Sequence, residues 1–227
     1  TLEILRRLRG ELDQIGELTT RAAQVIRDGG TVWTSMDRGH MPHYEQAEQR
    51  RGNPRLLKDH REFEPLNRGD MVFTNWCHRD VLAARERGVY VVCVTSNYQD
   101  NEFRPAGFTD ITHSNPDGLT LKDVSNAILH SHIPYTQGLV DSPEFPEFTL
   151  CPSSTTGSGT VHWLINAELA YRVAHPEAKE TDKSTAYLSI LTERVESVRD
   201  HMAAIRETAA AAARETAAVA MMTGAAA

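Results

Sequence analysis

The sequence predicts an α/β fold built on a parallel sheet, and three observations support this prediction. First, residues 69 to 97, GDMVFTNWCHRDVLAARERGVYVVCVTSN, alternate strand, loop, helix and strand, with apolar runs at Met71–Thr74 and Val91–Thr95. Second, further short apolar strands are expected at Thr31–Met36 and Ala127–Ser131. Third, helical patterns separate these runs, and strands that alternate with helices form parallel sheets covered on both faces.

The two ends of the chain are predicted to be long helices outside the sheet. Leucine and other apolar residues recur at helical spacing from Leu2 to Val25, and the run Asp28-Gly29-Gly30 is a stop signal. A second long helix is expected over 181–217, with Ala-rich repeats and a frayed end. Such apolar stripes are too long for one domain to cover and favour a homodimer or higher homo-oligomer.

The chain is therefore divided into three parts. Residues 1–28 form an N-terminal helix that packs on the domain or on a partner subunit. Residues 29–175 form the α/β domain, and residues 176–227 form a C-terminal helical extension. Within the domain, residues 44–64 carry few apolar positions and are expected to be partly helical and solvent-facing. Residues 132–148, with three prolines, predict a long irregular loop of the kind that often carries function.

Composition excludes several classes of protein. The 227 residues carry a net charge of −7 without a basic stripe, which argues against a nucleic-acid partner. Three separated cysteines without a C-x-x-C pair suit a reducing compartment and argue against a disulfide scaffold. No apolar run approaches the ~20 residues that span a bilayer, and the charged N-terminal pattern is not a signal peptide. A cytoplasmic protein without a membrane partner is expected.

Three segments carry a resemblance to a known family. They are GGTVWTSMDRGHMPH (29–43), the strand–loop–helix–strand unit with its preceding Arg68 (68–97), and CPSSTTGSGTVHWLINAEL (151–169). In this order they resemble the SIS (sugar isomerase) family, the phosphosugar-binding domain of phosphoheptose isomerases and related proteins. The resemblance implies a three-layer αβα sandwich with a parallel, flavodoxin-like sheet. It also implies a sugar site at the loop after Met71–Thr74, in which a phosphate loop has degenerated.

The resemblance implies a set of substrate-binding residues in two loops. The family uses small hydroxyl residues and glycine around the phosphate. Here Trp76 and Cys77 stand at the small positions, so the site would be shallower, with charge supplied by Arg79 and His78, or would stack an unphosphorylated sugar on Trp76. Cys77 is interpreted as lining, not as a nucleophile. The implied substrate-binding residues are Thr74, Asn75, Trp76, Arg79, Ser153, Ser154, Thr155 and Thr156.

Acid/base and metal candidates come from histidines and a carboxylate that follow the strands. Isomerisation of an aldose to a ketose needs groups that move a proton between adjacent carbons, and His40, Glu45 and His78 are the catalytic candidates. Four histidines could instead bind a divalent metal, although ten histidines in one chain also give chance pairs. These metal candidates are His40, His43, His130 and His132.

The sequence thus predicts binding of a sugar or phosphosugar with aldose–ketose isomerase chemistry. No cofactor is required in this interpretation, and a divalent metal is left open. One alternative is a non-catalytic sugar-sensing or structural SIS protein, for which the changed phosphate loop is the best argument. A further alternative is a metal-dependent lyase or hydrolase that uses the histidines.

Overall fold

A computed structural model describes most of the chain up to residue 182. The described residues are 2–36, 43–47, 49–59, 63, 65–95, 117–134, 138–144, 146, 150–179 and 182. The helix expected over 181–217 lies outside them. The helical elements are α1 (Leu2–Leu8), the 3₁₀ turn η1 (Arg9–Glu11), α2 (Leu12–Arg27), α3 (His43–Gln46), α4 (Arg79–Glu86), α5 (Leu121–Val124) and α6 (Ser154–Ala174). The strands are β1 (Val32–Ser35), β2 (Leu57–Asp59), β3 (Met71–Thr74), β4 (Tyr90–Val94) and β5 (Ala127–Leu129).

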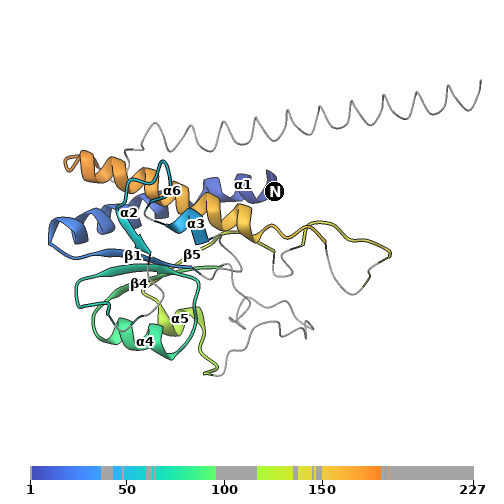
Figure 1. The fold of residues 1–227 in the computed structure, drawn as a ribbon, viewed down its shortest axis with the longest axis horizontal. Coiled ribbons are helices and arrows are strands. Elements are labelled where there is room, and N and C mark those ends of the chain that lie inside the picture. The colour runs from blue at the N-terminus through green and yellow to red at the C-terminus, as the bar shows by residue number, and fades with distance from the viewer. Residues whose placement is uncertain are drawn as a thin grey trace, which may run out of the picture.

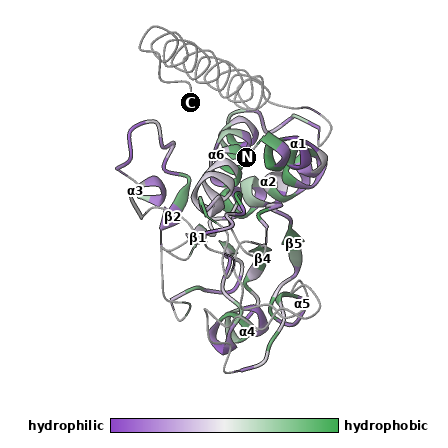
Figure 2. Ribbon diagram, turned by 90° about the vertical axis from the view of Figure 1, so that its right-hand side faces the viewer, coloured by the Kyte–Doolittle hydropathy of each residue, from purple (hydrophilic) through white to green (hydrophobic). Residues whose placement is uncertain are grey.

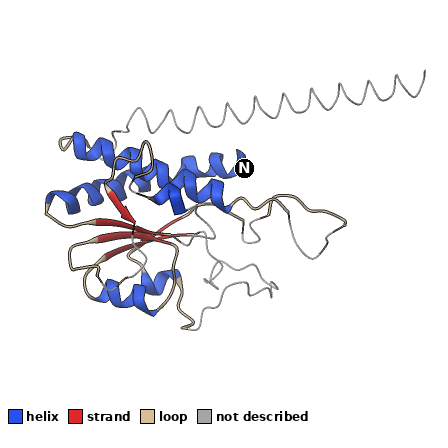
Figure 3. Cartoon of the chain, in the orientation of Figure 1, coloured by secondary structure: helices blue, strands red, loops and turns tan. Residues whose placement is uncertain are grey.

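The five strands form one parallel sheet in the order β2-β1-β3-β4-β5. Figure 3 shows these strands in red between two groups of helices. The parallel α/β sheet predicted from the sequence is confirmed. This order equals the 2-1-3-4-5 order of doubly wound sheets, in which the chain direction along the sheet reverses between β1 and β3. In the register of these two strands, Ser35 lies opposite Thr74 at the carboxyl ends.

Helices cover both faces of this sheet (Figure 1). Helices α1, α2 and α6 pack on one face, where Leu8, Ile15 and Leu164 join the inward side chains of the strands in one hydrophobic core. Helices α4 and α5 pack on the other face, around Val72, Val81 and their neighbours. The middle strands β3 and β4 are therefore largely apolar on both faces, as parallel strands usually are. Figure 2 shows β4 and the edge strand β5 in the hydrophobic colour.

One segment differs from the sequence prediction. Residues 44–64 were expected to be partly helical and solvent-facing; α3 agrees with the helical part, but the stretch also contains the edge strand β2. Leu57, Gln46 and Phe63 are all buried. The LKD sequence of β2 has a single apolar residue because an edge strand needs only one inward side chain of three, so the usual alternation is too short to detect.

The turn between α2 and β1 leaves no space for a side chain at Gly30. A Cβ atom there would lie 2.7 Å from the Gly69 carbonyl oxygen and 2.9 Å from Val25 Cγ1. Gly29 has φ of +85°, in the left-handed region that commonly ends a helix. The stop signal of the sequence therefore also fixes how closely α2 approaches the start of β3.

We predict that Gly30→Ala lowers the free energy of unfolding by about 1–3 kcal/mol, because the Gly69 carbonyl is backbone and cannot rotate away. Gly10→Ala is the matched control, since a Cβ at Gly10 meets nothing within 4 Å. The control should be neutral or stabilising by up to about 1 kcal/mol. Urea denaturation of both variants measures the difference, and equal stabilities would contradict this account of the turn.

Candidate functional site

The strand order points to the carboxyl ends of β1 and β3 as the place for a ligand. In doubly wound sheets, ligands bind where the strand order reverses. Here the Thr74 hydroxyl donates to the Ser35 carbonyl oxygen at 2.8 Å and accepts from the Trp76 backbone N–H at 3.1 Å. Thr74 thus joins the two strand ends and sets the path of the loop that follows. We call residues 75–78, between β3 and α4, the β3–α4 loop.

Aromatic side chains line this loop. The His78 ring lies 5.5 Å from the Trp76 ring and 5.5 Å from the Phe63 ring, between centroids. Asn75 and Cys77 are buried, and the Cys77 thiol donates to the Leu119 carbonyl oxygen at 2.8 Å. Trp76 and His78 are half-buried. The loop therefore presents two partly open rings and keeps Cys77 turned inward.

His78 is the titratable group of this loop. Burial lowers the pKa of His78, and the carboxylates of Asp80 and Asp117 oppose this effect only in part. Its Nδ1 lies 3.7 Å from an Asp80 carboxylate oxygen. The imidazole is therefore mainly neutral at pH 7, able to accept a proton but without the positive charge that a phosphate site would use.

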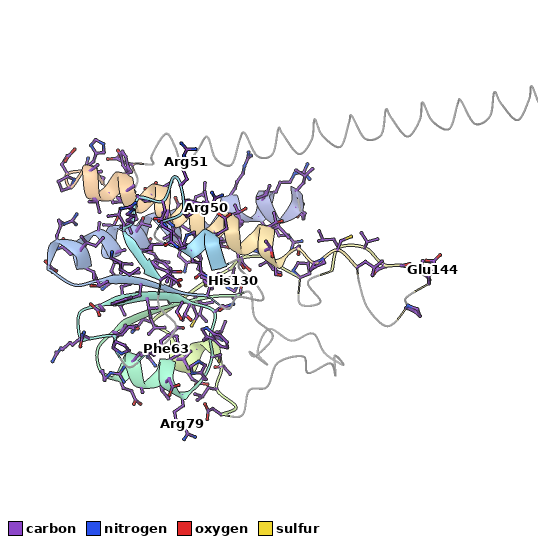
Figure 4. The ribbon with its side chains drawn as sticks, in the orientation of Figure 1. Arg50, Arg51, Phe63, Arg79, His130 and Glu144 are labelled. Atoms are coloured by element: carbon purple, nitrogen blue, oxygen red, sulfur yellow. The ribbon has the colours of Figure 1, made fainter. Side chains whose placement is uncertain are left out.

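Arg79 begins α4 and is paired with Asp117. Its guanidinium lies 3.1 Å from one Asp117 carboxylate oxygen, and its backbone N–H donates to the other at 2.8 Å. The Arg79 side chain is 80% exposed, and Figure 4 shows it at the outer surface, pointing away from the sheet. The residue expected to bind substrate therefore has its backbone N–H and its Nη2 group in contact with a carboxylate of the protein itself.

The Ser/Thr turn at the start of α6 lies beside a different strand. Ser153 and Ser154 are buried, whereas Thr155 and Thr156 are exposed. A Cβ atom on the next residue, Gly157, would lie 2.5 Å from Ile133 Cγ1, in the segment that leaves β5. The turn is therefore held against the exit of the outer strand β5, two strands away from β3.

Glu45 belongs to the helical layer on the other face of the sheet. Its carboxylate accepts hydrogen bonds from Trp163 Nε1 of α6 at 3.0 Å and from Arg50 Nη2 at 3.1 Å. Partial burial works to raise the pKa of Glu45, but the hydrogen bonds from Arg50 and Trp163 outweigh it and hold that pKa below its ordinary value. The carboxylate joins α3 to α6, while His78, another catalytic candidate, packs on the α4 side.

A buried histidine that the sequence analysis did not single out lies next to Glu45. His162 Nε2 lies 2.9 Å from Asn166 Nδ2, one turn further along α6. Burial lowers the pKa of His162 to about 4, although the Glu45 carboxylate and a hydrogen bond with the Glu45 backbone oppose it. His162 is therefore a neutral, hydrogen-bonded residue of the packed interior.

The described histidines are not gathered for a metal. His132 Nε2 lies 2.7 Å from a Glu11 carboxylate oxygen, and the His130 and His132 rings are 6.2 Å apart between centroids. Within the part of the chain that the structure describes, no three His, Cys, Asp or Glu side chains are grouped to hold a metal ion. His40 and the His43 side chain lie outside that part.

A polar groove lies at the opposite edge of the sheet. It runs along α2 and the first residues of β4 and β5, Tyr90 and Ala127. The Arg21 guanidinium stands over the Tyr90 ring, 4.2 Å from its centroid. Because it adjoins the amino ends of the strands, this groove lies away from the edge at which doubly wound proteins bind ligands.

Comparison with known proteins adds no family to this description. No protein-family model matches the chain, and no curated protein matches its sequence.

None of the helices in the described ranges is long and apolar enough to cross a membrane. All three cysteines are free thiols, two of them buried. Fold and site therefore define the class of protein: a parallel α/β protein with an aromatic loop at the reversal of its sheet.

We predict that His162 makes the protein less stable in mild acid. Its folded pKa of about 4 lies below the usual 6.5, so the unfolded chain binds the proton more tightly. The neutral state of His162 thus contributes to the free energy of unfolding, on the order of 3 kcal/mol in total. This contribution is complete above pH 6.5 and is lost as the pH falls toward 4. Urea denaturation from pH 7 to pH 4 should show a smaller loss for His162→Gln. The exposed His175→Gln control should follow the wild type; three parallel curves would rule out this role.

Proposed function

We propose that this chain is a sugar-binding protein of SIS type, a three-layer αβα domain that takes a sugar or sugar phosphate at the β3–α4 loop. The observation that carries the proposal is the position of Trp76 and His78, two half-buried rings at the reversal of the strand order. Aromatic faces suit the apolar C–H face of a sugar ring, and adjacent polar groups can bind its hydroxyls.

Binding without catalysis is the form of this proposal that the contacts favour. Glu45 is hydrogen-bonded to Trp163 of α6, on the face of the sheet opposite His78. Of the three catalytic candidates, His40 lies outside the described residues. Glu45 and His78 would have to reach one substrate, and the Glu45 carboxylate is already bound to Arg50 and Trp163. A sugar sensor or carrier needs no such pair.

Aldose–ketose isomerisation is the second candidate, and the neutral state of His78 favours it. Burial lowers the pKa of this imidazole, and a neutral imidazole can take a proton from the carbon beside a carbonyl group. In this form His78 alone provides the base among the described residues of the loop.

A thermal-shift screen with free sugars and sugar phosphates tests the binding proposal. A bound sugar should raise the apparent melting temperature by mass action. Trp76→Ala should weaken the best ligand by about tenfold or more, because it removes the stacking surface. Tyr171→Ala is the control, because Tyr171 lies in the last turn of α6, at the end of this helix that Figure 1 shows beside the amino ends of the strands.

The screen contradicts the proposal if no sugar stabilises the protein or if Trp76→Ala binds as well as the wild type. For any sugar that binds, proton exchange with deuterated water at the carbon beside the carbonyl separates the two forms. Exchange that is lost in His78→Gln supports isomerisation. Binding without exchange supports the non-catalytic form.

A further inference from the structure

Asp117 occupies the N-terminus of α4, where an anionic ligand would be expected. One carboxylate oxygen accepts from the Arg79 backbone N–H at 2.8 Å, and the other lies 3.1 Å from Arg79 Nη2. The Asp117 side chain is only 19% exposed, whereas its Arg79 partner is 80% exposed. Because backbone N–H groups at a helix N-terminus are the groups that hold phosphates, this sheltered carboxylate takes the position of a ligand anion.

The charges around the loop also disfavour a second anion. Among the described residues at this helix end, Arg79 supplies a positive charge, and it is paired with Asp117. Asp80, in the first turn of α4, adds a second carboxylate, and His78 is neutral. A phosphate dianion at this helix end would therefore have to compete with the Asp117 carboxylate for the Arg79 guanidinium and backbone N–H.

The hydrogen-bonding groups at the two strand ends suit a neutral ligand instead. The Thr74 hydroxyl is used by Ser35 and Trp76 and is not free for a phosphate. The Ser35 hydroxyl is buried and has no hydrogen-bond partner within the described structure. The Thr34 hydroxyl faces Gln46 of α3, so strand alternation turns Ser35 toward the α4 side. The Ser35 hydroxyl can both donate and accept a hydrogen bond, which suits a hydroxyl of a ligand.

We infer that Asp117 acts as a built-in anion that excludes phosphate and makes this site selective for unphosphorylated sugars. The inference rests on the proposed function, because it names the sugar class that the β3–α4 loop takes. Asp117 is thereby a specificity residue, and its carboxylate supplies at the α4 N-terminus the charge that a phosphosugar would bring. The ligand is then held by Trp76, His78 and hydroxyl contacts.

A purely structural role for Asp117 is the competing explanation. The contact joins the start of α4 to the segment that precedes α5, a helix with its own capping box of Thr120 and Asp123. A tether of this kind would affect stability but not the preference between free and phosphorylated ligands. The test must therefore measure selectivity.

Inorganic phosphate is the probe, and its binding to the full chain is measured in two ways. Calorimetry gives the affinity, and the amide signal of Arg79 in nitrogen-15 NMR spectra reports binding at the α4 N-terminus. The wild type should show no Arg79 shift up to about 10 mM phosphate. Asp117→Ala should bind phosphate at least about tenfold more tightly, with a shift at Arg79. Asp80→Asn is the matched control: it removes one charge from the same helix turn but leaves the Arg79 N–H occupied. It should stay within about threefold of the wild type.

Matched pairs of free sugars and their phosphates complete the experiment. The wild type should prefer the free sugar, and Asp117→Ala should shift the preference toward the phosphate by about tenfold or more. Wild-type binding of phosphate with an Arg79 shift overturns the inference and leaves sugar binding intact; this measurement decides even if the variant does not fold. A folded Asp117→Ala without a gain in phosphate affinity also overturns it. A phosphate gain in a protein that binds no sugar instead supports the role of Asp117 and contradicts the proposed function.

Discussion

The hydroxyl of Thr74 is the small constraint on which the candidate site depends. It donates a hydrogen bond to the Ser35 carbonyl of β1 and accepts one from the Trp76 N–H. The hydroxyl therefore acts both as a donor and as an acceptor inside the protein. This is why the chain leaves the sheet with Trp76 half-open and Cys77 buried. The Thr74 hydroxyl donates its proton within the protein and so does not donate to a ligand. The loop lies at the reversal of the sheet and presents an aromatic surface there.

The polar side chains on the two faces of the sheet differ in how accessible they are. On the α6 side, Glu45, Trp163 and His162 form a packed network in which each polar group holds a neighbouring element. On the α4 side, His78 and Trp76 remain partly accessible, next to the ion pair of Arg79 and Asp117. Buried polar networks stabilise a fold when they are satisfied, whereas recognition needs groups that a ligand can reach. The α4 side is therefore the better candidate for recognition.

The sequence predicted the sheet better than the contacts of the site. The apolar run of β3 and the Gly29-Gly30 stop are local signals, and both appear in the structure where the pattern indicated. The edge strand β2 escaped detection because LKD has one inward residue. The Arg79–Asp117 pair joins residues 38 positions apart, and its carboxylate lies outside every motif of the sequence. Likewise, nothing local distinguishes His162, in a helix of mixed composition, from an exposed histidine. Long-range pairing of charges is a property of the folded chain, so it could not be predicted from spacing.

The central claim is that a sugar binds at the reversal of the sheet, on the α4 side of β1 and β3. The most direct measurement follows every backbone amide by NMR while a stabilising sugar is titrated into the full chain. The account predicts the largest shifts in residues 74–79 and at Ser35, with small changes along α2. Shifts concentrated instead in the groove of Arg21 and Tyr90, with the β3–α4 loop unchanged, would contradict it.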